Sequence, residues 1–470
     1  MLPTTRPDVN LTIREAGGEM APSGAPRSAR RQIARRLQAS LTDFLRWQGR
    51  HRRLFDRLEA VPDPRDPRRT RIPLPAVLLA VLCLFWLDLR SLHALDDHLR
   101  HRPSLRRVLA LAGWHGAIAD DTFADALSRL DWTTVRAFLH FQSKREMKRW
   151  GAGRYLDCDL GARLKAVGAG HLAAKALVAI DGHDLFASER RCCPDCRVRQ
   201  VTRKRNGQLV KVTEYFHAAV VAHWVGAHPA MVLDFEPIRP GEGELTAAYR
   251  LVERLGRVFA SSIGILVADA LYDGEPFRRL AQQVGYDVVH RQKNELIDPG
   301  RSARRTLDRQ DPQRQRPHGR HREGKRRYAA WDVPADGRRY VEVHRTNDDK
   351  VHVGACMTSL PARRAPAIAV AMIMETRWWI ENTGFHELAG AWSFDRAFVH
   401  AGRPKAAWAF VALALTAFNA FQAYIYRNLK LDPQRPERSL VALRRDLFET
   451  LAAFAWPRGP QARAPCASAL

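Results

Sequence analysis

The chain has 470 residues, enough for about three domains of about 150 residues each and for well-buried cores. Its 76 Lys and Arg residues outnumber its 50 Asp and Glu residues, so the formal net charge is +26, and a hydrophobic fraction of 46% excludes a wholly disordered chain. This charge predicts an anionic partner: nucleic acid is the commonest one for a large basic protein, and a membrane surface is the alternative.

Residues 1–40 are expected to form a mobile basic arm, because Pro, Gly, Ser and Ala precede a group of arginines. From 41 to 150, apolar residues recur at spacings of three and four, which predicts a helical domain. Within it, residues 106–112, a glycine-bearing turn and a helix with Thr122 and Asp125 as a capping box predict a helix-turn-helix. That motif would place Ser128 and Arg129 near a DNA groove; ordinary helix packing is the alternative interpretation.

From Lys175 the pattern is typical of a mixed α/β sheet. Runs rich in Val and aromatic residues alternate with helical periodicity, and Asn206–Gly207 is a strong hairpin signal. The predicted strands are 176–180, 208–212, 214–222, 230–235, 263–268 and 287–290, and the predicted helices are 243–259 and 275–284. Several strands followed by a helix, a strand, a helix and a strand indicate a mixed sheet.

The segment 295–365 is predicted to interrupt this core. Residues 301–327 hold eleven Lys and Arg against three acids and almost no apolar residue, which indicates a solvated basic loop. Predicted strands at 328–331, 340–344 and 351–356 add a β-rich insertion. Helical spacing resumes at 367, so the core comprises 175–294 and 366–430, and a C-terminal segment, 431–470, carries a last helix over 439–454 and a tail.

The two longest apolar stretches, 72–87 and 406–426, are predicted to be core helices rather than membrane spans. Prolines interrupt the first, and polar residues at every third position mark one stripe along the second. The first thirteen residues lack an apolar core, so no secretory signal is expected, and seven cysteines, an odd number, favour a reducing compartment. We therefore expect a cytoplasmic protein with no membrane partner.

Two of the predicted strands run into an aspartate, Asp181 and Asp269. Ligands collect at the carboxyl ends of strands in open α/β sheets, so these carboxylates are expected to converge although they lie far apart in the chain. Close carboxylates repel each other unless a cation lies between them, and Mg²⁺ prefers oxygen ligands. Taken singly, either aspartate is explained as well by a helix cap or a turn.

A third acid is expected at the start of the late helical region. Glu375, Glu381 and Glu387 are six residues apart, which turns a helix by about 120° in magnitude, so one face presents only one of them. Arg377 and Glu381, four apart, share a face and offer a carboxylate for a metal ion and a guanidinium for phosphate. An exposed surface ion pair is the alternative interpretation.

The acids lie in three blocks, Val178–Gly182, Ala268–Gly274 and Arg377–Asn382. These blocks resemble the motifs of DDE transposases of bacterial insertion sequences, over roughly residues 175–426. The segment from about 54 to 131 is similar to the domain that commonly precedes the catalytic one. The resemblance implies an RNase H-like mixed sheet flanked by helices, with Asp181 on the first strand, Asp269 after the fourth and Glu381 on a later helix. The all-α domain would precede it, and the β-rich insertion would come before the last catalytic helix.

The resemblance also implies an activity. Two Mg²⁺ or Mn²⁺ ions held by Asp181, Asp269 and Glu381 would support DNA strand cleavage and strand transfer at terminal inverted repeats. The implied partners are double-stranded DNA, as transposon ends and target, and a second copy in a synaptic homodimer, within the bacterial cytoplasm at the nucleoid. Two alternatives stay open: an RNase H-like nuclease that cuts without joining, and a non-catalytic DNA-binding protein, either a decayed transposase or a regulator.

The chain departs from the family pattern near its third acid. Relatives often have a Tyr three residues before the Arg and a Lys seven after the Glu, where this chain has Met374 and Leu388. Arg377 keeps its place. The side chains considered for gripping the DNA ends in place of that Lys are Arg396, Arg403 and Lys405.

A separate group of residues suggests a structural Zn²⁺ site. Cys193 and Cys196 form a C-x-x-C pair, and Cys192 and His217 would complete four ligands if the following hairpin folds back. Free cysteines are also common as small buried hydrophobic residues, which is the alternative interpretation.

Overall fold

The computed structural model describes residues 39–155, 159–190, 192–292, 299–399, 403–431 and 438–454, with the side chains of 149–159 and Thr383 left out. Of the expected basic arm, only Ala39 and Ser40 are among these residues. The residues from Ala39 onward belong to one compact unit, so the helical segment and the sheet are packed together rather than held as separate bodies.

The N-terminal segment is helical, as its apolar spacing predicts. Its helices are α2 (Leu41–Arg52), α3 (Leu54–Glu59), α4 (Leu74–Trp86), α5 (Leu92–His101), α6 (Pro103–Leu109), α7 (Asp120–Arg129) and α8 (Trp132–Tyr155). Helices α2, α4, α7 and α8 pack on α15 (Pro404–Arg427), whose apolar stretch is long enough to cross a membrane but is buried throughout. Trp86 Nε1 donates to Ala417 O at 3.1 Å, and α4 is also buried, so both apolar stretches are core helices as predicted.

The predicted capping box is wrong. Helix α7 begins at Asp120, two residues earlier than expected, so Thr122 lies inside the helix and caps nothing. Phe123 and Leu127 are fully buried, and Arg129 pairs with Asp125 of its own helix at 3.1 Å. Helix α7 packs against α4, α5 and α15, which is ordinary helix packing.

In the described part of the chain, ten strands form one sheet. They are β1 (Ala176–Ser188), β2 (Arg197–Arg205), β3 (Gln208–Val225), β4 (Met231–Pro237), β5 (Ile263–Ala268), β6 (Asp287–Arg291), β7 (Gly319–Glu323), β8 (Arg326–Ala335), β9 (Arg338–Asn347) and β10 (Lys350–Thr358). Strands β1, β3 and β4 form an antiparallel meander, and β5 and β6 run parallel to β1, in the order β4-β3-β1-β5-β6. This order is that of an RNase H-like core, which confirms the predicted fold class.

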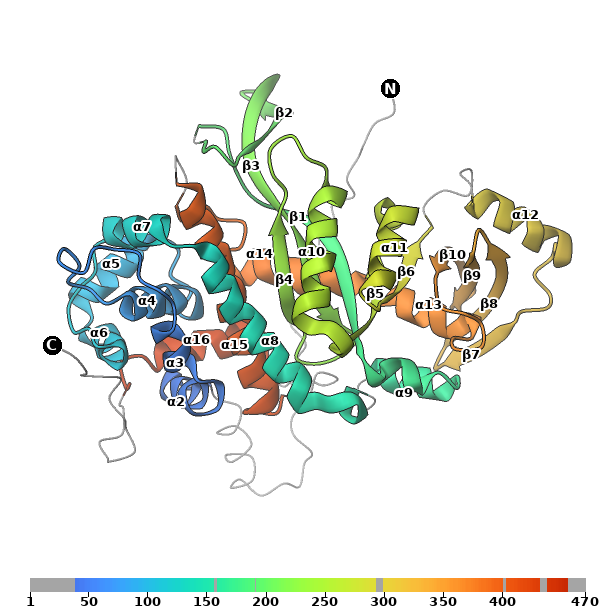
Figure 1. Cartoon of the computed structure of the whole chain (residues 1–470), viewed down its shortest axis with the longest axis horizontal. Coiled ribbons are helices and arrows are strands. Elements are labelled where there is room, and N and C mark those ends of the chain that lie inside the picture. Colours follow the sequence, from blue (N-terminus) through green and yellow to red (C-terminus); the bar gives the residue numbers. More distant parts are fainter. Residues whose placement is uncertain are drawn as a thin grey trace. The chain divides into compact units, whose positions relative to one another are not determined.

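Helices cover this sheet. Two that follow its strands are α10 (Glu244–Phe259), which packs on β3 and β4, and α11 (Glu275–Gln283), which packs on β6. The remaining helices are α9 (Asp159–Ala166), α13 (Ala367–Glu375), α14 (His386–Trp392) and α16 (Leu440–Glu449); of these, α13 packs on strands of the insertion, and α16 packs on α2 and α4. Figure 1 shows α10 in front of the strands and α14 behind them, so helices lie on both faces. The β2–β3 hairpin extends beyond the meander and turns at Asn206–Gly207, as predicted.

The β-rich insertion extends the same sheet instead of forming a second one. Strand β10 pairs with β6, and β9, β8 and β7 follow in order. Asp336–Gly337 and Asp348–Asp349 connect its hairpins with positive φ at both residues, the backbone that favours two-residue hairpin turns. Strands β8, β9 and β10 contain the predicted runs 328–331, 340–344 and 351–356, whereas β7 was not predicted.

The predicted basic loop over 301–327 is wrong in part, because α12 (Gly300–Gln310) forms within it and β7 and β8 begin there. Ala303 and Leu307, four residues apart, bury their side chains in a cluster with Trp331 and Tyr340. Two apolar residues are enough here because the strands supply the rest of the cluster. Arg314 donates from Nε to Glu342 at 2.8 Å, so part of this basic charge is paired inside the insertion.

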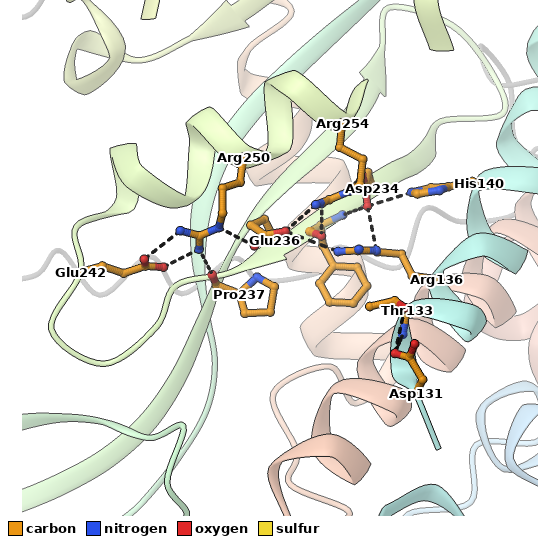
Figure 2. Close-up of polar contacts among 11 residues, drawn as sticks. Asp131, Thr133, Arg136, His140, Asp234, Glu236, Pro237, Glu242, Arg250 and Arg254 are labelled. Atoms are coloured by element: carbon orange, nitrogen blue, oxygen red, sulfur yellow. Dashed lines mark hydrogen bonds and ion pairs between the residues drawn. The ribbon is translucent and has the colours of Figure 1, made fainter. Parts of the chain in front are cut away.

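A network of ion pairs joins α8 and α10 to β4 (Figure 2). Asp234, with a fully buried side chain, accepts from Arg254 Nε at 2.7 Å, and His140 Nε2 lies 3.0 Å away. Glu236 binds Arg254 at 2.6 Å and Arg250 at 2.8 Å. Burial raises the pKa of Asp234, but His140 and Arg254 outweigh burial and leave that pKa below its ordinary value.

We expect Asp234→Asn to lower the free energy of unfolding by about 3–5 kcal/mol, because it leaves buried cations without their carboxylate. Urea unfolding measures this, with Glu253→Gln on the exposed face of α10 as the control. Since folding depresses the pKa of Asp234, its stabilising effect is present above the unfolded pKa of about 3.9 and is lost as pH falls through the folded value. An Asp234→Asn protein as stable as wild type at pH 7 would contradict this account.

Candidate active site

The register of two parallel strands brings Asp181 and Asp269 side by side. Ile180 of β1 pairs with Ala268 of β5, so each aspartate is the next residue on its strand. Neighbouring strands are about 4.8 Å apart, which places these two residues together at one edge of the parallel pairing. Strand β1 was predicted to end at Ile180; it continues to Ser188 because its antiparallel pairing with β3 extends that far.

The sequence left two roles open for Asp269, a backbone cap and a member of the carboxylate group, and its position is consistent with both. Its Oδ1 accepts from Leu271 N at 2.7 Å, so the aspartate caps the short turn Ala270–Tyr272. It also influences Asp181 through the electrostatic repulsion of like charges. A capping role and a place among the carboxylates are therefore compatible.

An arginine connects the third acid to Asp181. Helix α13 ends at Glu375, and Glu381 lies in the π-helical turn Ile380–Phe385 that follows. Arg377 Nη1 donates to Glu381 Oε1 at 2.6 Å and lies 3.5 Å from Asp181 Oδ2. Arg377 is buried, so its guanidinium is enclosed between the two carboxylates rather than presented to solvent.

As the six-residue spacing predicts, the three glutamates Glu375, Glu381 and Glu387 point in different directions. Glu375 points away and pairs with Arg163 at 2.8 Å, while Glu387 accepts from Gln422 Nε2 at 3.0 Å. Of the three glutamates, Glu381 alone contacts Arg377 among the described ion pairs.

A fourth carboxylate, Glu244, was not anticipated from the sequence. It is the first residue of α10, where an acid in the first helical turn is common and so gives no signal of function. Its Oε1 accepts from the hydroxyl of the buried Tyr272 at 2.5 Å. Only the strand topology brings the start of α10 next to Asp181 and Asp269.

The pKa of Asp181 records this crowding. Burial raises it most, Arg377 lowers it in part, and the charges of Glu244, Asp269 and Glu381 raise it further, to about 7. Burial and Asp269 likewise raise the pKa of Glu244. Four carboxylates, two of them paired with Arg377, are a set of hard oxygen donors that fits Mg²⁺ or Mn²⁺, because a divalent cation removes the repulsion.

The other residues predicted to bind DNA lie elsewhere. Arg396, Arg403 and Lys405 are exposed, before and at the start of α15. Among the described residues, the structure shows no contact between these three side chains and the carboxylates.

The cysteine cluster forms with three of its four predicted residues. Cys193 Sγ and Cys196 Sγ lie 3.2 and 3.4 Å from His217 Nε2 and 3.7 Å from each other, and all three residues are buried. Zn–S bonds of about 2.3 Å and Zn–N bonds of about 2.0 Å give tetrahedral edges of about 3.5–3.8 Å, close to these distances. Cys192 is exposed and is not part of the cluster, so its inclusion was wrong.

An RNase H-like sheet with carboxylates at the ends of its parallel strands defines the class of this protein: RNase H-like proteins with an acidic site. Within that class, residues 214–419 match the family model described as the transposase DDE domain. The matched span contains Asp269 and Glu381 and begins after Asp181. This part of the chain is therefore similar to a transposase DDE domain.

Among solved structures, the chain is similar to a piggyBac transposase determined by cryo-electron microscopy as a synaptic complex with hairpin DNA. The identity is 14% and the TM-score 0.40, over 85% of this chain and 77% of that one. The RNase H-like assignment rests on the strand order and does not depend on this likeness. No curated protein matches the chain.

The raised pKa of Asp181 predicts how stability varies with pH. A carboxyl whose pKa is higher in the folded chain binds its proton more tightly when folded, so ionisation between pH about 4 and about 7 destabilises the fold. We expect Asp181→Asn to remove this loss and raise the free energy of unfolding at pH 8 without metal, by about 4 kcal/mol at most. Denaturant unfolding at pH 5 and pH 8 in a chelator measures it; parallel pH profiles for variant and wild type would refute it.

Proposed function

We propose that this protein is the transposase of a bacterial insertion sequence, which cuts and joins DNA strands at the terminal inverted repeats of its own element. The observation that carries the proposal is the meeting of Asp181, Asp269 and Glu381 in a chain that is similar to a transposase DDE domain over residues 214–419. A place in the bacterial cytoplasm, at the nucleoid, follows from that substrate.

Asp181, Asp269 and Glu381 would hold the divalent ions. When bound, such ions activate a water or a DNA 3′-hydroxyl and stabilise the leaving oxygen of a phosphodiester. The chain itself provides the positions: β1 and β5 fix the two aspartates by register, and Arg377 keeps Glu381 beside Asp181. With the carboxylates neutralised by metal, Arg377 would become free to bind a DNA phosphate.

The basic surface would hold the DNA. A net charge of +26 favours sequence-independent contacts with phosphates, as transposon ends and as target. Arg396, Arg403 and Lys405 are exposed and available for this. Joining two ends in one event would require at least a homodimer.

The test combines purified protein, Mg²⁺ and DNA that carries matched ends. We expect Asp269→Asn and Glu381→Gln to reduce strand cleavage and transfer by about 100-fold or more, because each removes an oxygen ligand, while binding to the ends persists. Glu375→Gln, six residues before Glu381 and paired with Arg163, is the matched control and should keep its activity.

The products distinguish the alternatives. Joined strands from the wild-type protein support a transposase, whereas cuts without joining indicate a nuclease. Shifted DNA bands without cleavage indicate a binding protein. Cleavage that survives in Asp269→Asn would overturn the assignment of the site.

We also propose that Cys193, Cys196 and His217 bind a structural Zn²⁺ ion. The cluster is buried under α15, where Trp408 lies edge-on to His217 and donates to Asp195 at 3.0 Å. Zinc there would fasten the segment between β1 and β2 to β3. Two thiols and one imidazole fit zinc, and a fourth ligand would complete the tetrahedron.

Metal analysis of the purified protein tests the zinc site. We expect about one zinc per chain in the wild type, and loss of zinc in Cys193→Ser and Cys196→Ser because each removes a ligand. Cys192→Ser is the matched control, since Cys192 is exposed, and should retain zinc. Zinc-free wild-type protein, or equal zinc in all variants, would contradict the proposal.

A further inference from the structure

The Glu244 carboxylate approaches the site from the opposite face of the sheet to Glu381. Side chains alternate between faces along β1. Asp181 faces Arg377, and His183 stacks on Phe385 of the π-helical turn at 4.2 Å, so both point to the face of Glu381. Gly182, between them, faces the start of α10, which lies in front of the strands in Figure 1.

Gly182 makes this approach sterically possible. A Cβ atom at this position would overlap the carboxylate of Glu244, so any other residue would push that carboxylate away. The backbone N–H of Gly182 lies 3.0 Å from Asp181 Oδ1 and also forms a hydrogen bond that lowers the pKa of Glu244. The two carboxylates therefore converge on one backbone N–H.

The surroundings of Glu244 direct its carboxylate toward the site. It forms no side-chain cap at the start of α10, and the Tyr272 hydroxyl, three residues after Asp269, donates to it. Glu242, two residues earlier, is instead paired with Arg250 of α10 at 2.6 Å (Figure 2). Among the described ion pairs, none joins Glu244 to a Lys or Arg.

We propose that Glu244 is a fourth metal-binding carboxylate of this site, beside Asp181, Asp269 and Glu381, with Tyr272 as its positioning residue. The proposal rests on the proposed function, because it assumes that the three predicted acids bind divalent ions. A carboxylate on each face of the sheet, with the two aspartates at its edge, would let two ions share Asp181. Gly182 and Tyr272 are then needed to bring Glu244 into range.

The test measures Mn²⁺ binding to the full chain without DNA, by titration calorimetry and by the electron paramagnetic resonance of free Mn²⁺. We expect Glu244→Gln, which has nearly the same shape, to weaken binding of at least one ion tenfold or more. Glu242→Gln is the matched control and should bind as the wild type does. Tyr272→Phe keeps the carboxylate but removes the donor, so a smaller loss of affinity is expected.

The outcomes distinguish a failure of the role of Glu244 from a failure of the proposed function on which it rests. If Asp181→Asn loses Mn²⁺ binding and both Glu244→Gln and Tyr272→Phe keep wild-type affinity and stoichiometry, the role of Glu244 is refuted and the three-acid site stands. If Asp181→Asn binds Mn²⁺ as the wild type does, the proposed function itself fails. Should Glu244→Gln not fold, an unchanged affinity in Tyr272→Phe would still refute the positioning of Glu244.

Discussion

The fold around this site has to hold together carboxylates that repel one another. Asp181 is close enough to Glu244, Asp269 and Glu381 for all three to raise its pKa. Nothing in the four side chains favours such a grouping, so the rest of the fold must hold it. The apolar strands contribute most: Leu177 to Ile180 of β1 are fully buried, and their register with β5 leaves the two aspartates no other place.

The helix that carries Glu244, α10, is held in place by acids that are paired with arginines, in contrast to the mutually repelling acids of the site. On β4, Asp234 and Glu236 are each paired with arginines, and the pKa of Asp234 stays low. These pairs hold α10 against the meander from the middle of the helix, two to three turns after Glu244. A paired ion network thus holds the helix that contributes Glu244 to the cluster of acids.

Features that depend on local sequence could be predicted, whereas those that depend on packing between distant segments could not. Strand β5 is a short apolar run that ends where Asp269 begins, so its bounds were predicted correctly. The four-residue spacing predicted that Arg377 would face Glu381, because the two residues are close in sequence. Glu244 was missed because its position depends on how α10 packs on the sheet.

The errors have the same origin. Residues 301–327 are too polar to fold alone, and α12 forms because Ala303 and Leu307 meet apolar residues that come later in the chain. Strand β1 passes Asp181 because β3 pairs with it, which no local pattern records. Cys192 stands next to a cluster residue in sequence, yet its side chain is exposed while Cys193 is buried. These three errors concern contacts made by residues distant in sequence.

The sign of the local charge at the site is opposite to that of the whole chain. A net charge of +26 attracts DNA from a distance, but four carboxylates against one guanidinium repel a phosphate at close range. Arg377 is the cation that the chain itself supplies, and it allows Glu381 to lie beside Asp181 before any metal is present. In the proposed function, a scissile phosphate would therefore enter only when further positive charge has been added. The basic surface and the acidic site would then act in succession: the first would hold DNA, and the second would admit it once metal is bound.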